Sequence, residues 1–198
     1  MARVLMLDIG GVFYRGWPED DFWPRWSART GLNRAELEDW LSTSDEARLA
    51  RLGHISAVEY YARAASRYAA DPDTFRTLLE DAYANGFNTR FADFVRELIA
   101  RGVPVWALTN SLSAEAVWMR RPGFEGLFEG VISSCECGLA KPDLAIFAFA
   151  AQRAGAKPSE ILFVDDIMSH VEAARAAGFE AIQFDDTDKV IAELAGRW

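Results

Sequence analysis

Residues 4–12 read VLMLDIGGV. The stretch begins with an uninterrupted apolar run, residues 4–7, which stops abruptly at Asp8. Runs of the same kind stop at Thr109, Ser133, Asp165 and Asp185. Continuous apolar character, without a polar residue at every second position, is typical of strands buried on both faces, as in parallel sheets. The runs predict strands at residues 3–7, 103–108, 130–132, 161–164 and 181–184.

The segments between the later strands carry helix punctuation. We expect helices that begin at Asn88, Ser113, Asp143 and Ser169, and glycines that end them at 102, 155 and 178. From residue 88 onward, helices and strands therefore alternate. This order predicts an open, doubly wound (Rossmann-like) α/β fold with a parallel sheet of about five strands.

Residues 15–87 carry no strand signal. Asn33 with Glu36 and Ser56 with Glu59 form capping-box patterns, and Asp71-Pro72 marks another helix start. A helical segment that leaves a sheet after one strand and returns to it is predicted to be a cap over the strand ends. We therefore expect an α/β core domain at 1–14 and 88–198, and an inserted all-helical cap of four or five helices at 15–87.

Composition limits the function classes. The net charge of -9 argues against nucleic acid or an anionic membrane as the main partner. No apolar run approaches the ~18 residues of a membrane span, and the run before Asp8 is too short for a signal-peptide core. The two cysteines, Cys135 and Cys137, lie too close together to brace the fold, so we expect a reducing, cytoplasmic location.

Polar side chains stand at the ends of the predicted strands, where open α/β sheets bind ligands. Asp8 follows the first strand, Thr109 the second and the pair Asp165-Asp166 the fourth, while Lys141 lies in the loop after the third. Clustered carboxylates repel one another unless a cation lies between them, and an oxygen-only set favours Mg²⁺ over zinc. With the lysine, the hydroxyl and a helix N-terminus, they would form a receptor for a phosphoryl group.

Each of these residues has a plainer explanation when taken alone. An Asp after a strand is usually a turn or helix cap, Thr109-Asn110-Ser111 is an ordinary capping cluster, and Lys141 is a solvated loop residue. Their joint occurrence at corresponding strand ends is what indicates a site.

Other candidates are weaker. Cys135-x-Cys137 has no second cysteine pair, which argues against a zinc site. His54 precedes a helix start and His170 lies one turn into a helix, so we expect both at the surface or at helix caps. We expect the tryptophans of the cap to be buried between its helices, with one or two free to face a substrate: Trp17, Trp23, Trp26 and Trp40.

In order and spacing these residues resemble the haloacid dehalogenase-like (HAD) superfamily, along nearly the whole chain. Counterparts of its four motifs lie at Leu7–Val12, Leu108–Ser111, Gly138–Asp143 and Asp165–Arg175. The helical insertion resembles the family's small cap. The stretch from Gly53 to Tyr60 resembles the subgroup that holds the phosphatase domain of soluble epoxide hydrolase and bacterial sugar-phosphate phosphatases.

The resemblance implies a Mg²⁺-dependent phosphohydrolase for a small phosphorylated metabolite. Asp8 would attack phosphorus and form an aspartyl-phosphate. Thr109, Asn110 and Lys141 would bind the phosphate, and Lys141 would also offset the charge of Asp8.

The resemblance also implies a metal site. The carboxylates of Asp8 and Asp166 and the backbone carbonyl of Gly10 would hold Mg²⁺, and Asp165 would act through water or from behind the direct ligands.

One position departs from the family pattern. Most family phosphatases carry an Asp two residues after the nucleophile as general acid, and here that residue is Gly10. Losing a general acid costs roughly 10²–10⁴ in rate. Some members of the resembling subgroup also carry glycine there. An acid from Glu19, Asp20 or Asp21 could compensate, and a substrate with a good leaving group would need none.

Other functions therefore stay open. Gly10 also fits a HAD-fold protein that binds a phosphate ester with weak or no turnover. A haloacid dehalogenase is disfavoured, because that branch replaces the acidic pair with uncharged residues and follows its nucleophile with Tyr-Gly-Thr. A phosphoreceiver domain is disfavoured because it has its acidic pair after the first strand and no cap; mutase or phosphonatase chemistry is a further alternative. The sequence names neither the substrate nor an oligomeric state.

Overall fold

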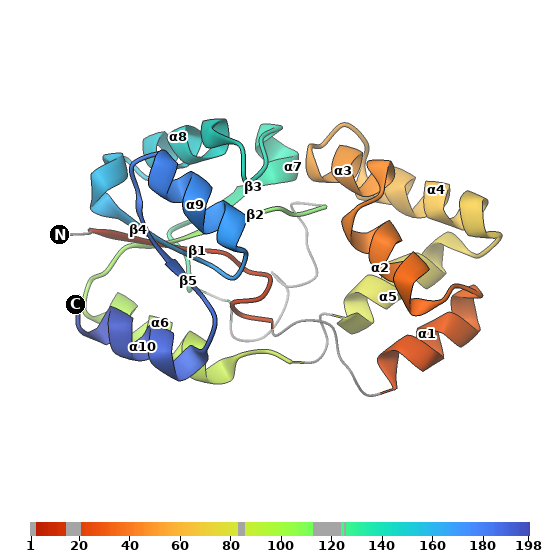
Figure 1. Cartoon of the computed structure of the whole chain (residues 1–198), viewed down its shortest axis with the longest axis horizontal. Helices are drawn as coiled ribbons and strands as arrows, with labels where there is room; N and C mark the ends of the chain where they lie inside the picture. The colour runs from red at the N-terminus through yellow and green to blue at the C-terminus, as the bar shows by residue number, and fades with distance from the viewer. Residues whose placement is uncertain (1–2, 15–20, 83–85, 113–123, 125) are drawn as a thin grey trace.

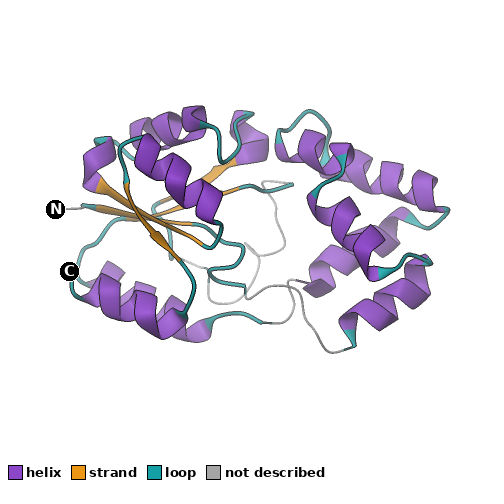
Figure 2. Ribbon diagram, viewed as in Figure 1, coloured by secondary structure: helices purple, strands orange, loops and turns teal. Residues whose placement is uncertain are grey.

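A computed structural model describes residues 3–14, 21–82, 86–112, 124 and 126–198. Five strands form one sheet in the order β3-β2-β1-β4-β5, and every neighbouring pair is parallel (Figure 2). The predicted doubly wound α/β fold is therefore confirmed. The strands are β1 (Val4–Leu7), β2 (Val105–Thr109), β3 (Gly130–Ser133), β4 (Ile161–Asp165) and β5 (Glu180–Gln183).

The continuous apolar runs form the middle of the sheet. Every residue of β1 and β4 is buried, and Leu5 of β1 pairs with Val105 on one side and Leu162 on the other. Strands covered on both faces need apolar residues on both, which is why these segments do not alternate.

Helices cover both faces of the sheet (Figure 1). The helices α6 (Thr89–Ala100) and α10 (Thr187–Ala195) pack into one apolar cluster, and α8 (Leu144–Arg153) and α9 (Met168–Ala176) pack into another. Asn88 and Asp143 cap α6 and α8 as predicted, since their side chains accept hydrogen bonds from the backbone N–H of Phe91 and Ala145. The helix predicted to begin at Ser113 lies outside the described residues.

The insertion has five helices within the described residues. They lie together beside the carboxyl ends of the strands (Figure 1). Asn33 and Glu36 make the reciprocal capping box, and Ser56 accepts a hydrogen bond from the N–H of Glu59. The helices share an apolar cluster of their own, in which Trp23, Trp26 and Trp40 are buried as expected; Trp17 lies outside the described residues. They are α1 (Phe22–Thr30), α2 (Arg34–Ser42), α3 (Asp45–Arg51), α4 (Ala57–Tyr68) and α5 (Pro72–Ala82).

The two chain segments that join this helical insertion to the sheet run side by side. The N–H of Asn88 donates to the carbonyl of Phe13 at 2.8 Å, and Tyr14 forms an antiparallel bridge with Phe87. The limits 1–14, 15–87 and 88–198 remain predictions, because residues 15–20 and 83–85 fall outside the described part. No helix within the described ranges is long and apolar enough to cross a membrane.

A second contact joins the insertion to the core, at the turn after α3. A Cβ built on Gly53 would lie 2.2 Å from the carbonyl oxygen of Cys135, so the two backbones touch. Cys135 belongs to α7 (Ser134–Cys137), a single turn that the sequence did not predict. Gly138, in the left-handed conformation at φ 70°, ends α7 and starts the loop that leads to Lys141.

Candidate active site

The predicted site residues meet at the carboxyl end of the sheet. Asp8 follows the central strand β1, while Thr109 and Asp165 are the last residues of its two neighbours, β2 and β4. The connection after β1 leads to β2 on one side of β1, whereas the connection after β3 leads to β4 on its other side. Open α/β sheets form their ligand crevice where the strand order reverses in this way. The topology therefore gathers side chains that lie far apart in the sequence.

Lys141 joins the carboxylates of Asp8 and Asp165. Its Nζ lies 2.8 Å from Oδ1 of Asp8 and 2.6 Å from Oδ2 of Asp165, and it donates to the carbonyl of Leu108 at 2.9 Å. The ammonium is fully buried and each of its three hydrogens has an acceptor within reach. The flexible lysine side chain is thus held in one place.

Burial and charge set the protonation of this group. Burial raises the pKa of the Asp8 carboxyl to about 7; the Lys141 ammonium opposes this rise and the Asp165 carboxylate adds to it. Burial alone would lower the pKa of Lys141, but the two carboxylates outweigh it and raise that pKa. For Asp165, burial is outweighed by Lys141 and His170, so its pKa is lowered. Lys141 and Asp165 therefore form a charged pair, with Asp8 as the group that titrates.

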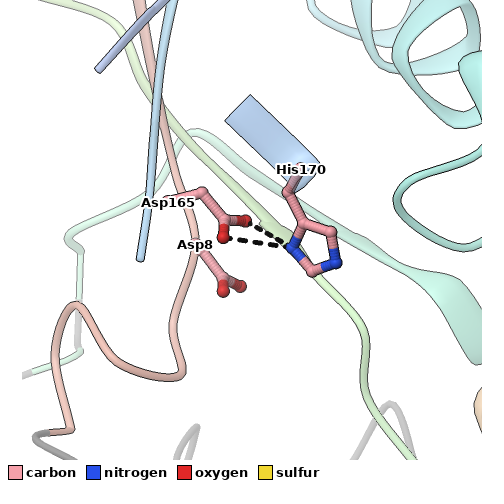
Figure 3. A group of neighbouring side chains, drawn as sticks. All are labelled: Asp8, Asp165 and His170. Carbon is pink, nitrogen blue, oxygen red and sulfur yellow. Dashed lines mark hydrogen bonds and ion pairs between the residues drawn. The ribbon is translucent and has the colours of Figure 1, made fainter. Parts of the chain in front are cut away.

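The expectation for His170 is wrong. Its side chain is buried, and its Nδ1 lies 3.0 and 3.1 Å from the two carboxylate oxygens of Asp165 (Figure 3). His170 shares a face of α9 with Val171 and Ala174, which are buried against the sheet. By contrast, His54 is exposed, as expected.

Asp166 lies against the loop that follows the first strand. A Cβ on Gly11 would stand 2.0–2.6 Å from all three carboxyl atoms of Asp166, so only a glycine allows this approach. Burial, followed by the negative charge of Asp165, raises the pKa of Asp166. A Cβ on Gly10, the preceding residue of the same loop, would meet nothing within 4 Å.

The charges of this group fit a divalent cation. When all three carboxylates are ionised they face one ammonium, which leaves an excess of two negative charges that a divalent cation would offset. The expected donors are oxygens of Asp8, Gly10 and Asp166, which suit Mg²⁺. Asp8, Asp165 and His170 also bring potential ligand atoms within 4.8 Å of one another. The Lys141 ammonium already bridges Asp8 and Asp165, so the group of Asp8, Asp165 and His170 does not suit a metal.

Asn110 lies beside Lys141, and its side-chain amide is already engaged. Its Nδ2 donates to the carbonyl of Lys141 at 2.9 Å, and its Oδ1 accepts from the Lys141 N–H at 3.0 Å. Asn110 therefore holds the loop that carries the lysine. Contact with phosphate stays a prediction, for the second amide hydrogen of Asn110 and for the buried hydroxyl of Thr109.

The acid that could replace the missing Asp is not identified by the described residues. Glu19 and Asp20 lie outside them. Asp21 is exposed at the N-terminal end of α1.

Comparison with known proteins identifies the family of the chain. The family model described as haloacid dehalogenase-like hydrolase matches residues 3–178. A solved structure of a HAD family enzyme from Bacteroides thetaiotaomicron, a magnesium complex, has a TM-score of 0.75, with 19% identity over 92% of this chain and 93% of that one. At this identity the structural likeness concerns the fold.

Curated relatives include phosphatases. Sesquiterpene phosphatase astK of Aspergillus oryzae is 31% identical over 54% of this chain and 55% of its own length. Bifunctional epoxide hydrolase 2 of Sus scrofa is 37% identical over 34% of this chain and 12% of its own length. The chain thus spans about half of the first protein and a small part of the second. With the family model matching most of its length, the chain belongs to the haloacid dehalogenase-like hydrolases.

Proposed function

We propose that this chain is a Mg²⁺-dependent phosphohydrolase that acts on a small phosphorylated metabolite through an aspartyl-phosphate on Asp8. The observation that carries the proposal is the buried Lys141 ammonium, 2.8 Å from Asp8 Oδ1, with Asp166 pressed against Gly11 of the same loop. This arrangement offers a nucleophile, a fixed positive charge and an oxygen-lined cation position at one strand end.

Two displacements at phosphorus would complete the reaction. A carboxylate oxygen of Asp8 bonds to phosphorus as the bond to the leaving oxygen breaks, and the leaving oxygen takes a proton. Water then attacks phosphorus, gives up a proton and releases inorganic phosphate and the Asp8 carboxylate. Lys141 and the Thr109 hydroxyl would hold the phosphoryl oxygens through both steps.

Asp8, the Gly10 carbonyl and Asp166 would hold the cation. Bound Mg²⁺ would neutralise the phosphoryl oxygens as their negative charge develops. The Bacteroides enzyme, which shares this fold, was solved as a magnesium complex, and this supports the choice of metal. The acidic pair, with Asp166 beside the nucleophile loop, supports a phosphatase over a dehalogenase.

Among phosphate esters, we propose as the first candidate substrates those with an apolar leaving group. One relative is named a sesquiterpene phosphatase, and exposed apolar side chains begin the two helices that start at this edge of the sheet: Leu144 on α8, and Ile167 and Met168 at the start of α9. A hydrocarbon leaving group could cover them. We further propose that the protein acts in the cytoplasm, where Cys135 and Cys137 would remain thiols.

Gly10 supports a second candidate, a protein that binds phosphate esters with little turnover. One experiment separates the two. Phosphate release is measured from p-nitrophenyl phosphate, a terpenyl monophosphate and a sugar phosphate, with Mg²⁺ and with EDTA, for the parent and Asp8→Asn. Mg²⁺-dependent release that Asp8→Asn abolishes supports the phosphohydrolase, and a terpenyl rate above the sugar rate supports the apolar class. Phosphate that binds without release from any ester would support the second candidate instead.

A further inference from the structure

His170 is one of two histidines in the chain, and it is placed where no surface or capping role explains it. Its Nδ1 contacts both oxygens of Asp165, at 3.0 and 3.1 Å. Figure 3 shows the Nδ1 edge of the ring turned toward the carboxylate and the Nε2 edge turned away from both Asp165 and Asp8. The imidazole ring is therefore oriented with Nδ1 toward Asp165.

Asp165 contacts both His170 and Lys141. The Asp165 side chain is fully buried; its Oδ1 accepts from the N–H of Ile167 at 2.8 Å, and its Oδ2 contacts Lys141 Nζ at 2.6 Å. Lys141 Nζ in turn lies 2.8 Å from Asp8. The chain of contacts thus runs from His170 through Asp165 and Lys141 to the nucleophile.

The chemistry of the partners fixes the tautomer. An ionised carboxylate only accepts hydrogen bonds, so Nδ1 must carry the hydrogen that joins His170 to Asp165. That hydrogen bond restricts rotation of the carboxyl group, together with the Ile167 N–H. Lysine has a long flexible stem, and the direction of its ammonium depends on the acceptors that hold it.

We propose that His170 is a positioning residue: its Nδ1–H fixes the Asp165 carboxylate, which keeps the Lys141 ammonium directed at Asp8. The kinetic consequence rests on the proposed phosphatase function, whereas the arrangement itself does not. Among the described residues, no hydrogen bond or ion pair joins His170 to Asp8, whereas its Nδ1 contacts Asp165, so we infer that it acts through Asp165 and Lys141.

Two near-isosteric variants test the role. His170→Asn places an amide nitrogen near the position of Nδ1, while His170→Gln places one near Nε2, on the edge turned away from Asp165. With p-nitrophenyl phosphate and Mg²⁺, we expect His170→Gln to lower kcat about 10- to 100-fold and His170→Asn to retain most of it. His54→Gln, on the exposed histidine, is the matched control and should match the parent. Equal kcat values for the two His170 variants would overturn the proposal.

A readout without turnover keeps the test independent of the proposed function. The chain has three lysines, Lys141, Lys157 and Lys189, of which only Lys141 is buried. In protein labelled with ¹⁵N at the lysine Nζ and the histidine ring, we expect a slowly exchanging Lys141 ammonium signal and a protonated Nδ1 on His170. His170→Gln should weaken the ammonium signal, and His170→Asn should preserve it.

The two readouts distinguish failure of the proposal from failure of the proposed function. A protein that releases no phosphate but loses the Lys141 signal in His170→Gln would refute the phosphatase and support the positioning role. An unchanged Lys141 signal in folded His170→Gln, or a hydrogen on Nε2 rather than Nδ1, would overturn the positioning role. Thermal melting of each variant confirms that it is folded.

Discussion

Restoring an acid at Gly10 should change which phosphate esters the protein hydrolyses. A Cβ at this position meets nothing within 4 Å, and the φ of Gly10 lies outside the left-handed region, so the Cβ of Gly10→Asp neither clashes nor strains the backbone. The new carboxyl would belong to the loop that leads from Asp8 to Gly11, against which Asp166 lies. Neighbouring negative charges raise the pKa of a carboxyl group, which suits a residue that must donate a proton.

The expected gain follows from what a general acid contributes. An alkoxide leaves poorly without a proton, whereas nitrophenolate leaves unaided. Gly10→Asp should therefore raise kcat/KM on alkyl or terpenyl phosphates by roughly 10²–10⁴ and change the p-nitrophenyl rate little. The parent should show the converse, a rate that falls steeply as the leaving group becomes more basic.

The assay compares the parent, Gly10→Asp and Gly10→Asn on matched aryl and alkyl phosphates at saturating Mg²⁺. Asn has nearly the same size as Asp and carries no acidic proton, so it should reproduce the parent. An alkyl-to-aryl ratio that is the same in all three proteins would refute the reasoning. A parent rate that is already independent of the leaving group would also refute it, and would indicate an acid from the helical insertion, such as Glu19, Asp20 or Asp21.

Further predictions concern the metal, the pH dependence and the contact between insertion and core. Calorimetry should show that Asp166→Asn weakens Mg²⁺ binding more than Asp165→Asn does; equal Mg²⁺ affinities of the two variants would contradict the ligand assignment. Asp165→Asn should instead lower the free energy of unfolding by about 3–5 kcal/mol, because it breaks a buried ion pair. Burial raises the pKa of Asp8 to about 7, so protons should compete with the metal below pH 7. In the parent, Mg²⁺ should therefore bind about tenfold more weakly at pH 6 than at pH 8. The same pH dependence in Asp8→Asn would contradict this expectation. Gly53→Ala should lower the free energy of unfolding by more than Gly31→Ala does. Gly31 has a φ of 75°, so an alanine there carries a similar backbone strain of about 1–3 kcal/mol, but it meets no neighbour within 4 Å. Equal losses in denaturant melts would show that the contact of Gly53 with Cys135 contributes nothing.

The fold was predictable because its strands are buried on both faces. Apolar runs marked all five strands, but Thr109 and Asp165 were expected just after a strand and instead end one. Their backbones pair with Ser133 of β3 and Gln183 of β5, and such pairing between strands cannot be seen in one strand's own sequence. The single turn α7 was missed because four residues are too few to show helical periodicity.

The candidate site was predictable as far as strand ends dictate it. Asp8, Asp165 and Asp166 had to meet at one edge, but the reach of Lys141 to two carboxylates depends on the path of its loop, which Asn110 fixes. His170 was predicted wrongly because its contact with Asp165 depends on how the chain turns between the end of β4 and the start of α9. Its spacing with Val171 and Ala174, on the face of a helix that packs against the sheet, was the available signal.

Trapping the covalent intermediate tests the central claim most directly. The protein is mixed with p-nitrophenyl phosphate and Mg²⁺, quenched in acid within a turnover, digested and analysed by mass spectrometry, with Asp8→Asn in parallel. We predict one phosphoryl group on the peptide that contains Asp8, removable by hydroxylamine and absent from the variant. Release of phosphate by the parent without any phosphorylated Asp8, or turnover by Asp8→Asn at a comparable rate, would contradict the proposed mechanism.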